Sequence, residues 1–239
     1  MPEMGNILNI LNGDTPLFIA AQDGNDKEVD RLLKKAGIQV NKPMKDGITP
    51  LFVAAQNGHN KVVELLLRKD DIQVNQAMNT GATPLFMAAH NGNDKVVALL
   101  LGKVGIQVNQ PMNGGVTPLF MAAQHGHSKV VDILLQKVAI QVNQPHANGV
   151  TPLLIAANNG HEKVVKLLLK KDGIQVNQAD LVGDTPLMMA AEGRHGTIVE
   201  MLLRTAAIQA IGWNGWRPHR RIFAPPQMPV GYTGPRIVM

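Results

Sequence analysis

Histidines at one recurring position are the residues of this sequence best suited to metal or acid–base chemistry. His59, His127, His161 and His195 fall at the same point of a 34-residue repeat. Neighbouring copies of a stacked repeat would place them about 10 Å apart, whereas the ligands of one metal ion lie about 2 Å from it. We therefore interpret this column as hydrogen-bonded residues at the starts of helices. We do not assign a metal site to His125-x-His127, the one close pair.

Nucleophiles are scarce. The chain has no cysteine and one serine, Ser128, so it has no disulfide framework, no thiolate metal site and few candidates for a covalent nucleophile. Gly81 and Gly115 lie in hairpin contexts and not in strand-to-helix loops, so they do not predict a nucleotide site. No acid, base and nucleophile converge in the sequence pattern. We expect a non-catalytic protein without a cofactor.

Positive charge is concentrated near the C-terminal end. The 239-residue chain has a formal net charge of +5, and residues 210–239 contain four arginines and no acid. The nearly balanced remainder carries no signature of nucleic-acid binding, but the basic cluster at residues 217–221 leaves open the docking of nucleic acid or an acidic surface. The beginning of the chain lacks a basic signal-peptide region, and no apolar run approaches about 18 residues. These features predict an intracellular, cytoplasmic protein without a membrane partner.

A 34-residue repeat organises most of the chain. In the copy at residues 49–82, Thr49 is suited to cap a helix that Pro50 begins. Asn57-Gly58 is suited to end that helix, and residues 61–69 form a second helix that is apolar on two sides. Because one unit cannot bury that much apolar surface, stacked copies must share a core. The tripeptide Thr-Pro-Leu begins at Thr15, Thr49, Thr83, Thr117, Thr151 and Thr185.

The order of short motifs within each copy resembles the ankyrin repeat: Thr-Pro-Leu, Ala-Ala, Gly-His, Val-Val, Leu-Leu-Leu and Val-Asn. This resemblance implies an all-α solenoid, in which helix-turn-helix units stack and short β-hairpins or loops connect them. The copies are expected at residues 15–48, 49–82, 83–116, 117–150, 151–184 and, as a partial last unit, 185–209.

Two positions depart together from the usual pattern of the family. Where histidine is common, four copies have phenylalanine, and where a hairpin aspartate is common, the sequence has Met44, Met78, Met112 and His146 before reverting at Asp180. We predict that methionine packs on phenylalanine, as Met78 would on Phe52 and Phe86. Such a sulfur–aromatic contact contributes about 0.3–1.5 kcal/mol.

The two ends of the stack are expected to differ. In the first copy, Glu28 and Arg31 occupy positions that are apolar in later copies, and at this spacing they can face solvent as an ion pair. This predicts an N-terminal cap with no further repeat upstream. Residues 1–14 are expected to form a lid, residues 210–224 a degenerate seventh repeat that caps the sixth, and residues 225–239 a disordered tail rich in Pro and Gly.

Arg194 interrupts the pattern of the turn between the two helices of a copy. The other copies have glycine at this point, which supplies a left-handed turn. We expect the sixth copy to shift its turn to Gly193 or Gly196.

Comparison of the copies locates a candidate binding surface. The framework barely changes, whereas the hairpin tips and the C-terminal ends of the first helices vary, and the resemblance places these positions on the concave surface that ankyrin proteins use for partners. Drift at unconstrained positions would give the same variation. The surface is rich in amides and lacks the Trp, Tyr and Arg typical of strong contact points. The candidate residues are Lys45, Asp46, Ile48, Gln56, Asn57, Asn79, Thr80, His90, Asn91, Asn113, Gln124, His125, Asn148, Asn158 and Asn159.

These observations predict a monomeric protein–protein interaction scaffold that binds a protein partner through this surface. A rigid stack presents its loops at little ordering cost, which favours binding. The alternative is an adaptor whose basic C-terminal tail docks nucleic acid or an acidic surface while the repeats provide a scaffold.

Overall fold

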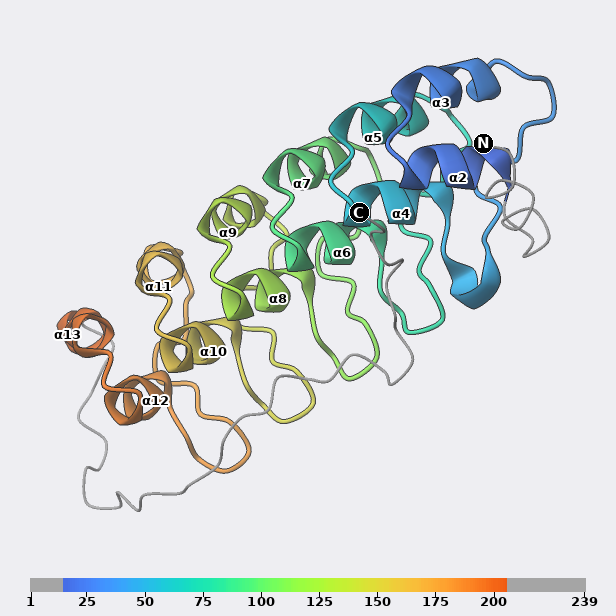
Figure 1. Cartoon of the computed structure of the whole chain (residues 1–239). Helices are drawn as coiled ribbons and strands as arrows, with labels where there is room; N and C mark the ends of the chain where they lie inside the picture. Colours follow the sequence, from blue (N-terminus) through green and yellow to red (C-terminus); the bar gives the residue numbers. More distant parts are fainter. Residues whose placement is uncertain (1–14, 206–239) are drawn as a thin grey trace, which may run out of the picture. The chain divides into compact units, whose positions relative to one another are not determined.

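Six consecutive helix pairs make up the part of the chain that the computed structural model describes, residues 15–205 (Figure 1). All of these residues belong to one compact unit. The first helices of the pairs are α2 (Pro16–Gln22), α4 (Pro50–Gln56), α6 (Pro84–His90), α8 (Pro118–Gln124), α10 (Pro152–Asn158) and α12 (Pro186–Glu192). The second helices are α3 (Asp26–Leu33), α5 (Asn60–Leu67), α7 (Asp94–Leu101), α9 (Ser128–Leu135), α11 (Glu162–Leu168) and α13 (Gly196–Arg204), and a 3-10 turn, η1 (Lys45–Gly47), precedes α4.

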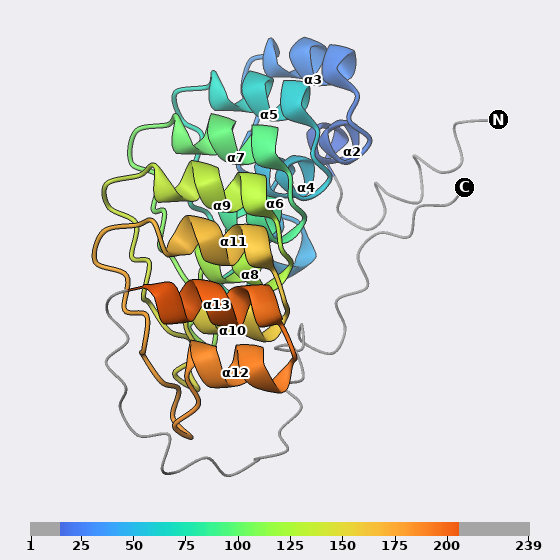
Figure 2. The same cartoon turned by 90° about the vertical axis from the view of Figure 1, so that its left-hand side faces the viewer.

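The pairs stack in two rows. First helices contact first helices and second helices contact second helices of the neighbouring pair, as α4 does with α6 and α5 with α7. Figure 2 shows the second helices lengthwise, one below another from α3 to α13. The core lies between the rows and between neighbours, where Phe52, Leu66 and Val97 are fully buried. The predicted all-α solenoid of helix-turn-helix units is confirmed.

The threonine–proline motif begins every first helix as expected. In α4, the Thr49 hydroxyl accepts a hydrogen bond from the backbone N–H of Phe52 at 3.1 Å, and Pro50 occupies the first helical position. The second helix of this copy begins at Asn60 and ends at Leu67, two residues before the predicted end at Lys69. It ends there because the chain turns and the Lys69 N–H bonds back to the Leu66 carbonyl at 3.1 Å.

The loops between pairs are narrow turns, and no residue between 15 and 205 is assigned to a strand. In the second copy, the Met78 N–H bonds to the Ala82 carbonyl at 2.9 Å and the Gly81 N–H to the Met78 carbonyl at 2.8 Å. Neighbouring tips are joined by one further bond, from the Asn79 N–H to the Asp46 carbonyl at 2.8 Å. The expected hairpins therefore form as closed turns tied to one another tip to tip.

The hairpin position that varies between Met, His and Asp behaves differently in each case. Asp180 accepts hydrogen bonds from the backbone N–H groups of Val182 and Asp184, at 3.0 and 2.9 Å. The His146 ring packs edge-on against Phe120, with ring centroids 5.0 Å apart. Met78 is buried, 8% exposed, and the contact of its sulfur with Phe52 and Phe86 stays a prediction.

Arg194 takes the left-handed conformation itself, with φ of 57°. The expected shift of the turn to Gly193 or Gly196 is therefore wrong, since Gly193 has φ of −71° as the helix cap. In the other copies the residue at this point is glycine, and a Cβ added at Gly160 would lie 2.6 Å from the His195 ring of the next copy. Among the described residues no later copy approaches Arg194, so its side chain does not clash with a neighbour. Only the conformational cost of a left-handed non-glycine residue remains.

At the first copy, Glu28 and Arg31 form the expected ion pair, with a nitrogen–oxygen distance of 2.6 Å, on the exposed side of α3. The expectations for residues 1–14, 210–224 and 225–239 lie outside the described residues.

A pair of substitutions tests this account of the turn. Arg194→Gly is expected to raise the free energy of unfolding by about 1 kcal/mol, because it removes a left-handed non-glycine residue. Gly160→Ala is expected to lower it by more than that, because the same conformational cost is joined by a clash with His195. Urea denaturation measures both. A destabilising Arg194→Gly would contradict the explanation.

Candidate functional site

The C-terminal ends of the first helices are tied from copy to copy by asparagine side chains. The Asn57 amide donates to the backbone carbonyl of Gln22 at 3.0 Å, Asn91 to Gln56 at 2.8 Å, and Asn159 to Gln124 at 2.9 Å. These predicted contact residues therefore also serve the framework.

The column of histidines adds a second set of ties. Each is the residue before a second helix, and its Nε2 bonds to a backbone carbonyl of the preceding copy, as His59 does to Gln22 at 2.9 Å and His195 to Asn158 at 3.0 Å. His127 and His161 do the same with His90 and Gln124. The interpretation of this column as hydrogen-bonded residues at helix starts is confirmed.

The predicted contact residues differ in exposure. We call them together the candidate face: the turn tips between pairs and the C-terminal ends of the first helices. Gln124 is buried, 5% exposed, and offers almost no contact area. Ile48, Gln56, Thr80, His90 and Asn158 are half-buried, and the exposed members are Lys45, Asp46, Asn57, Asn79, Asn91, Asn113, His125, Asn148 and Asn159.

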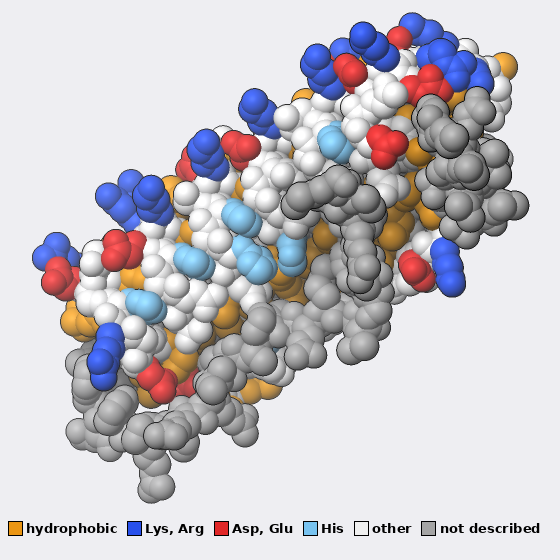
Figure 3. All heavy atoms as spheres, in the orientation of Figure 1, with side chains coloured by type: hydrophobic (Ala, Val, Ile, Leu, Met, Phe, Trp, Pro, Cys, Tyr) orange, Lys and Arg blue, Asp and Glu red, His pale blue; other side chains and the backbone are white. Residues whose placement is uncertain are grey.

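Three histidines meet on the candidate face, and we call them the histidine cluster: His90 at the end of α6, His125 just after α8, and His127 before α9. The ring centroids of His90 and His125 are 4.7 Å apart, and those of His125 and His127 are 5.9 Å apart and stacked. In Figure 3 the histidine side chains gather on one face, while Lys and Arg follow the edge formed by the second helices. The sequence indicated His90 and His125 only as separate contact positions.

The surroundings of the cluster favour neutral rings. Burial, together with weaker repulsion from the nearby His125 and His127, lowers the pKa of His90 to about 4. Burial also lowers the pKa of His125, with repulsion from His127 and His161. At neutral pH these rings are therefore uncharged and can donate or accept hydrogen bonds.

Candidate metal ligands do not gather in residues 15–205. No group of three or more His, Asp or Glu side chains there is arranged to hold a metal ion. No helix of this part of the chain is long and apolar enough to cross a membrane.

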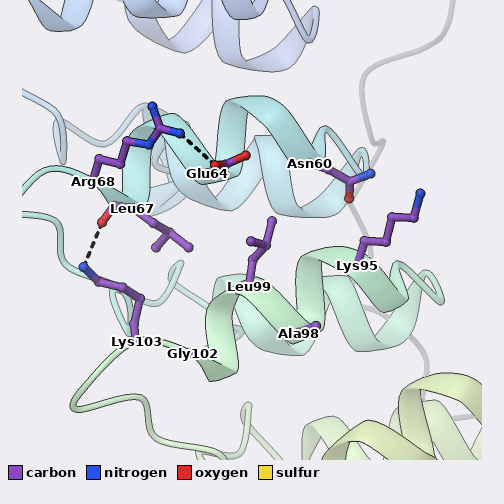
Figure 4. A pocket seen from close by; sticks show the side chains of 9 residues that line it. All are labelled: Asn60, Glu64, Leu67, Arg68, Lys95, Ala98, Leu99, Gly102 and Lys103. Atoms are coloured by element: carbon purple, nitrogen blue, oxygen red, sulfur yellow. Dashed lines mark hydrogen bonds and ion pairs between the residues drawn. The ribbon is translucent and has the colours of Figure 1, made fainter.

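A groove of about 620 Å³ lies on the other side of the stack, between α5 and α7 (Figure 4). Its apolar floor includes Leu67 and Leu99. Three of the four charged side chains that line it already have partners, since Arg68 bonds to Glu64 at 2.7 Å and the Lys103 ammonium group donates to the Leu67 carbonyl at 2.8 Å. The groove is therefore the junction of two neighbouring helices, with most of its charged groups paired.

Two further sets of residues hold the copies together and were not assigned this role from the sequence. The Asn75 amide donates to the Gly105 carbonyl at 2.8 Å and its oxygen accepts from the Gln107 N–H at 2.9 Å, and Asn41, Asn109 and Asn143 repeat the pattern. Lysines bond to the last turn of the preceding second helix, namely Lys103, Lys137 and Lys171. Their recurrence every 34 residues was the available signal.

Comparisons with known proteins agree with this architecture. A family described as Ankyrin repeats (3 copies) matches residues 2–78, 71–146 and 138–211. The crystal structure of EF0377, an ankyrin repeat protein, is similar with a TM-score of 0.74 and 24% sequence identity, over 79% of this chain and 96% of that one. At that identity the likeness shows the fold alone. No curated protein matches the sequence significantly.

The lowered pKa of His90 predicts a stability that depends on pH. The unfolded chain binds a proton near pH 6.5, whereas folded His90 binds one near pH 4. Stability is therefore greatest above this window and falls as the pH drops through it. His90→Gln, which installs the residue found in three other copies, is expected to reduce the loss between about pH 7 and pH 4 by about 1 kcal/mol, because the ring is partly solvated.

Urea denaturation across this pH range measures the effect. His195→Asn is the control, since the third copy has Asn93 at the same point and His195 lies outside the cluster. If both variants reduced the loss of stability at low pH equally, the role given to His90 would be contradicted.

Proposed function

The chain belongs to the ankyrin repeat family, and on that premise we propose that it binds a protein partner through the candidate face without catalysing a reaction. Ankyrin repeats generally mediate protein–protein interactions, and proteins built from them are typically non-enzymatic scaffolds. The identity of the partner and the face that binds it do not follow from the family. The choice of the candidate face is supported by the side chains and hydrogen bonds of this chain.

The rigidity of variable positions is the observation that carries the proposal. The turn tips are joined by backbone bonds of 2.8 to 3.0 Å, from the Asn79 N–H to the Asp46 carbonyl through to the Leu181 N–H on the Asn148 carbonyl. The helix ends are joined by the asparagine amides. Side chains that differ from copy to copy thus stand on a backbone that is held in place before any partner arrives. Such a surface loses little conformational entropy on binding.

The row of second helices is a weaker candidate for the partner surface. Several of its charged side chains are already paired, as Lys34 is with Asp30 at 2.6 Å and Arg204 with Glu200 at 3.3 Å. Three of its lysines bond to backbone carbonyls of the preceding copy. These groups would have to leave existing partners, and exposed pairs of this kind contribute little energy.

Capture of the partner from cell extract by the full chain tests the proposal. The face variant carries Gln56→Arg, Thr80→Arg and Asn113→Arg, which add charge and bulk at positions whose side chains are not among the ties described above. It is expected to lose a partner that the unmodified chain retains, by at least about tenfold, because a buried unpaired charge opposes binding.

The control variant carries Val104→Arg and Val138→Arg. These valines follow second helices, are 97% and 101% exposed, and add the same kind of charge away from the candidate face. Loss of the partner by the control, or its retention by the face variant, would contradict the proposal. A chain shortened to residues 1–209 tests the alternative, since an adaptor acting through its basic tail would lose its partner on that change.

A further inference from the structure

Two members of the histidine cluster, His90 and His125, stand where most other copies have amides. The position of His90 is Gln22, Gln56, Gln124 or Asn158 in four other copies, and the position of His125 is Asn57, Asn91 or Asn159 in three. Two neighbouring copies therefore replace adjacent amides by histidines, and the structure brings the rings into contact with each other and with His127.

This replacement gives up framework contacts. Asn91 and Asn159 each donate to the carbonyl at the end of the preceding first helix. In the fourth copy the corresponding carbonyl belongs to His90, and it is bonded by His127. The His125 ring lies beside the rings of His90 and His127. The Nδ1 atom of His90 is buried without a hydrogen-bond partner. A buried polar atom without a partner is unfavourable, and Gln124 at the equivalent position also has one, its Oε1. What the cluster gives up relative to the other copies is therefore the bond that an asparagine makes to the preceding first helix.

No carboxylate balances the cluster from within the described residues. The helices α4, α6, α8 and α10 contain no Asp, Glu, Lys or Arg. The second helices packed against them begin with Asp94 and Lys95 on α7, Lys129 on α9, and Glu162 and Lys163 on α11. Asp94 faces Lys129 across 4.0 Å. The charges that act on His90 and His125 come from other histidines, and these repel a proton.

We propose that the histidine cluster receives a carboxylate of the protein partner, from an Asp or Glu side chain of an acidic segment, and that the rings bind protons as the carboxylate arrives. This inference rests on the proposed function and specifies the chemistry at the centre of the candidate face. A carboxylate supplies both the acceptor oxygens and the opposite charge that the cluster lacks.

A dependence of affinity on pH follows from this chemistry. His90 and His125 are uncharged at pH 7 in the free protein, and a carboxylate beside them raises their pKa. Binding then takes up protons, so affinity rises as the pH falls from about 7 to about 5. It declines again near pH 4, where Asp and Glu themselves become protonated.

Histidine NMR on the full chain tests the inference directly. The probe is a hexaglutamate peptide blocked at both ends, with hexaglutamine as the neutral comparison, and the ring carbon–proton signals are followed across the pH range. Hexaglutamate is expected to raise the apparent pKa of His125 by about one unit, equivalent to about tenfold tighter binding of the peptide by the protonated ring. Hexaglutamine is expected to leave the apparent pKa of His125 unchanged. Neither peptide is expected to shift the titration of His59 or His195, which lie outside the cluster.

A double variant, His90→Gln with His125→Asn, restores residues that other copies already have at these positions and so preserves the fold. It is expected to lose the response of His127 to hexaglutamate. No shift at His125, an equal shift at every histidine, or a response at His127 that persists in the double variant would each overturn the inference. These outcomes leave the proposed function standing, because that depends on the capture experiment with the face and control variants, which do not alter the cluster.

Discussion

The helix pairs that lie between two others in the described stack have apolar surface on two sides, and one pair cannot bury it alone. Val63 and Leu66 of α5 are fully buried only because α3 and α7 lie on either side. The boundary between copies must therefore be dry, and the backbone groups that border it must find partners across it. Stability is then a sum of contacts between neighbours, and the rest of the structure follows from how each boundary is closed.

Side chains of the following copy close much of the polar rim of each boundary. Asparagine and histidine reach back to the end of the preceding first helix, and lysine reaches back to the end of the preceding second helix. A second asparagine, such as Asn75, reaches forward instead, to the loop that follows the second helix of the next copy. The glycine in the turn is fixed by the same requirement. A Cβ at Gly160 would occupy the space of the His195 ring. Side chains such as those of Gln56, Thr80 and Asn113 are not among these ties, and positions of this kind differ between copies.

Local signals were enough to predict the fold and the capping residues from sequence. Thr49 and Pro50 act within one helix turn, and the alternation of apolar residues needs no knowledge of the neighbour. The role of the histidine column was also predictable, because a fixed spacing excludes a shared metal site. Asn75 and Lys103 were missed because their partners lie in another copy, some 30 residues away, and depend on the register of stacking. The left-handed Arg194 was missed for a related reason. Glycine is required at this turn because the histidine of the next copy lies against it, and within the described residues no copy follows the sixth.

A repeat protein supplies its own reference, since each position shows what the framework tolerates. At the position of His125 the framework uses asparagine and gains a hydrogen bond from it. Departure from that residue in one copy alone could be drift, and an isolated histidine would carry little meaning. Two departures in neighbouring copies that place the ring centroids of His90 and His125 4.7 Å apart are different, because His125 makes His90 harder to protonate and neither ring repairs the lost bond. The contact lies between the third and fourth copies, where the stack is continuous on both sides, so the boundary can tolerate a local loss that a terminal copy could not. A weakened site in the middle of a rigid surface is where a ligand can recover in binding what the free protein lacks.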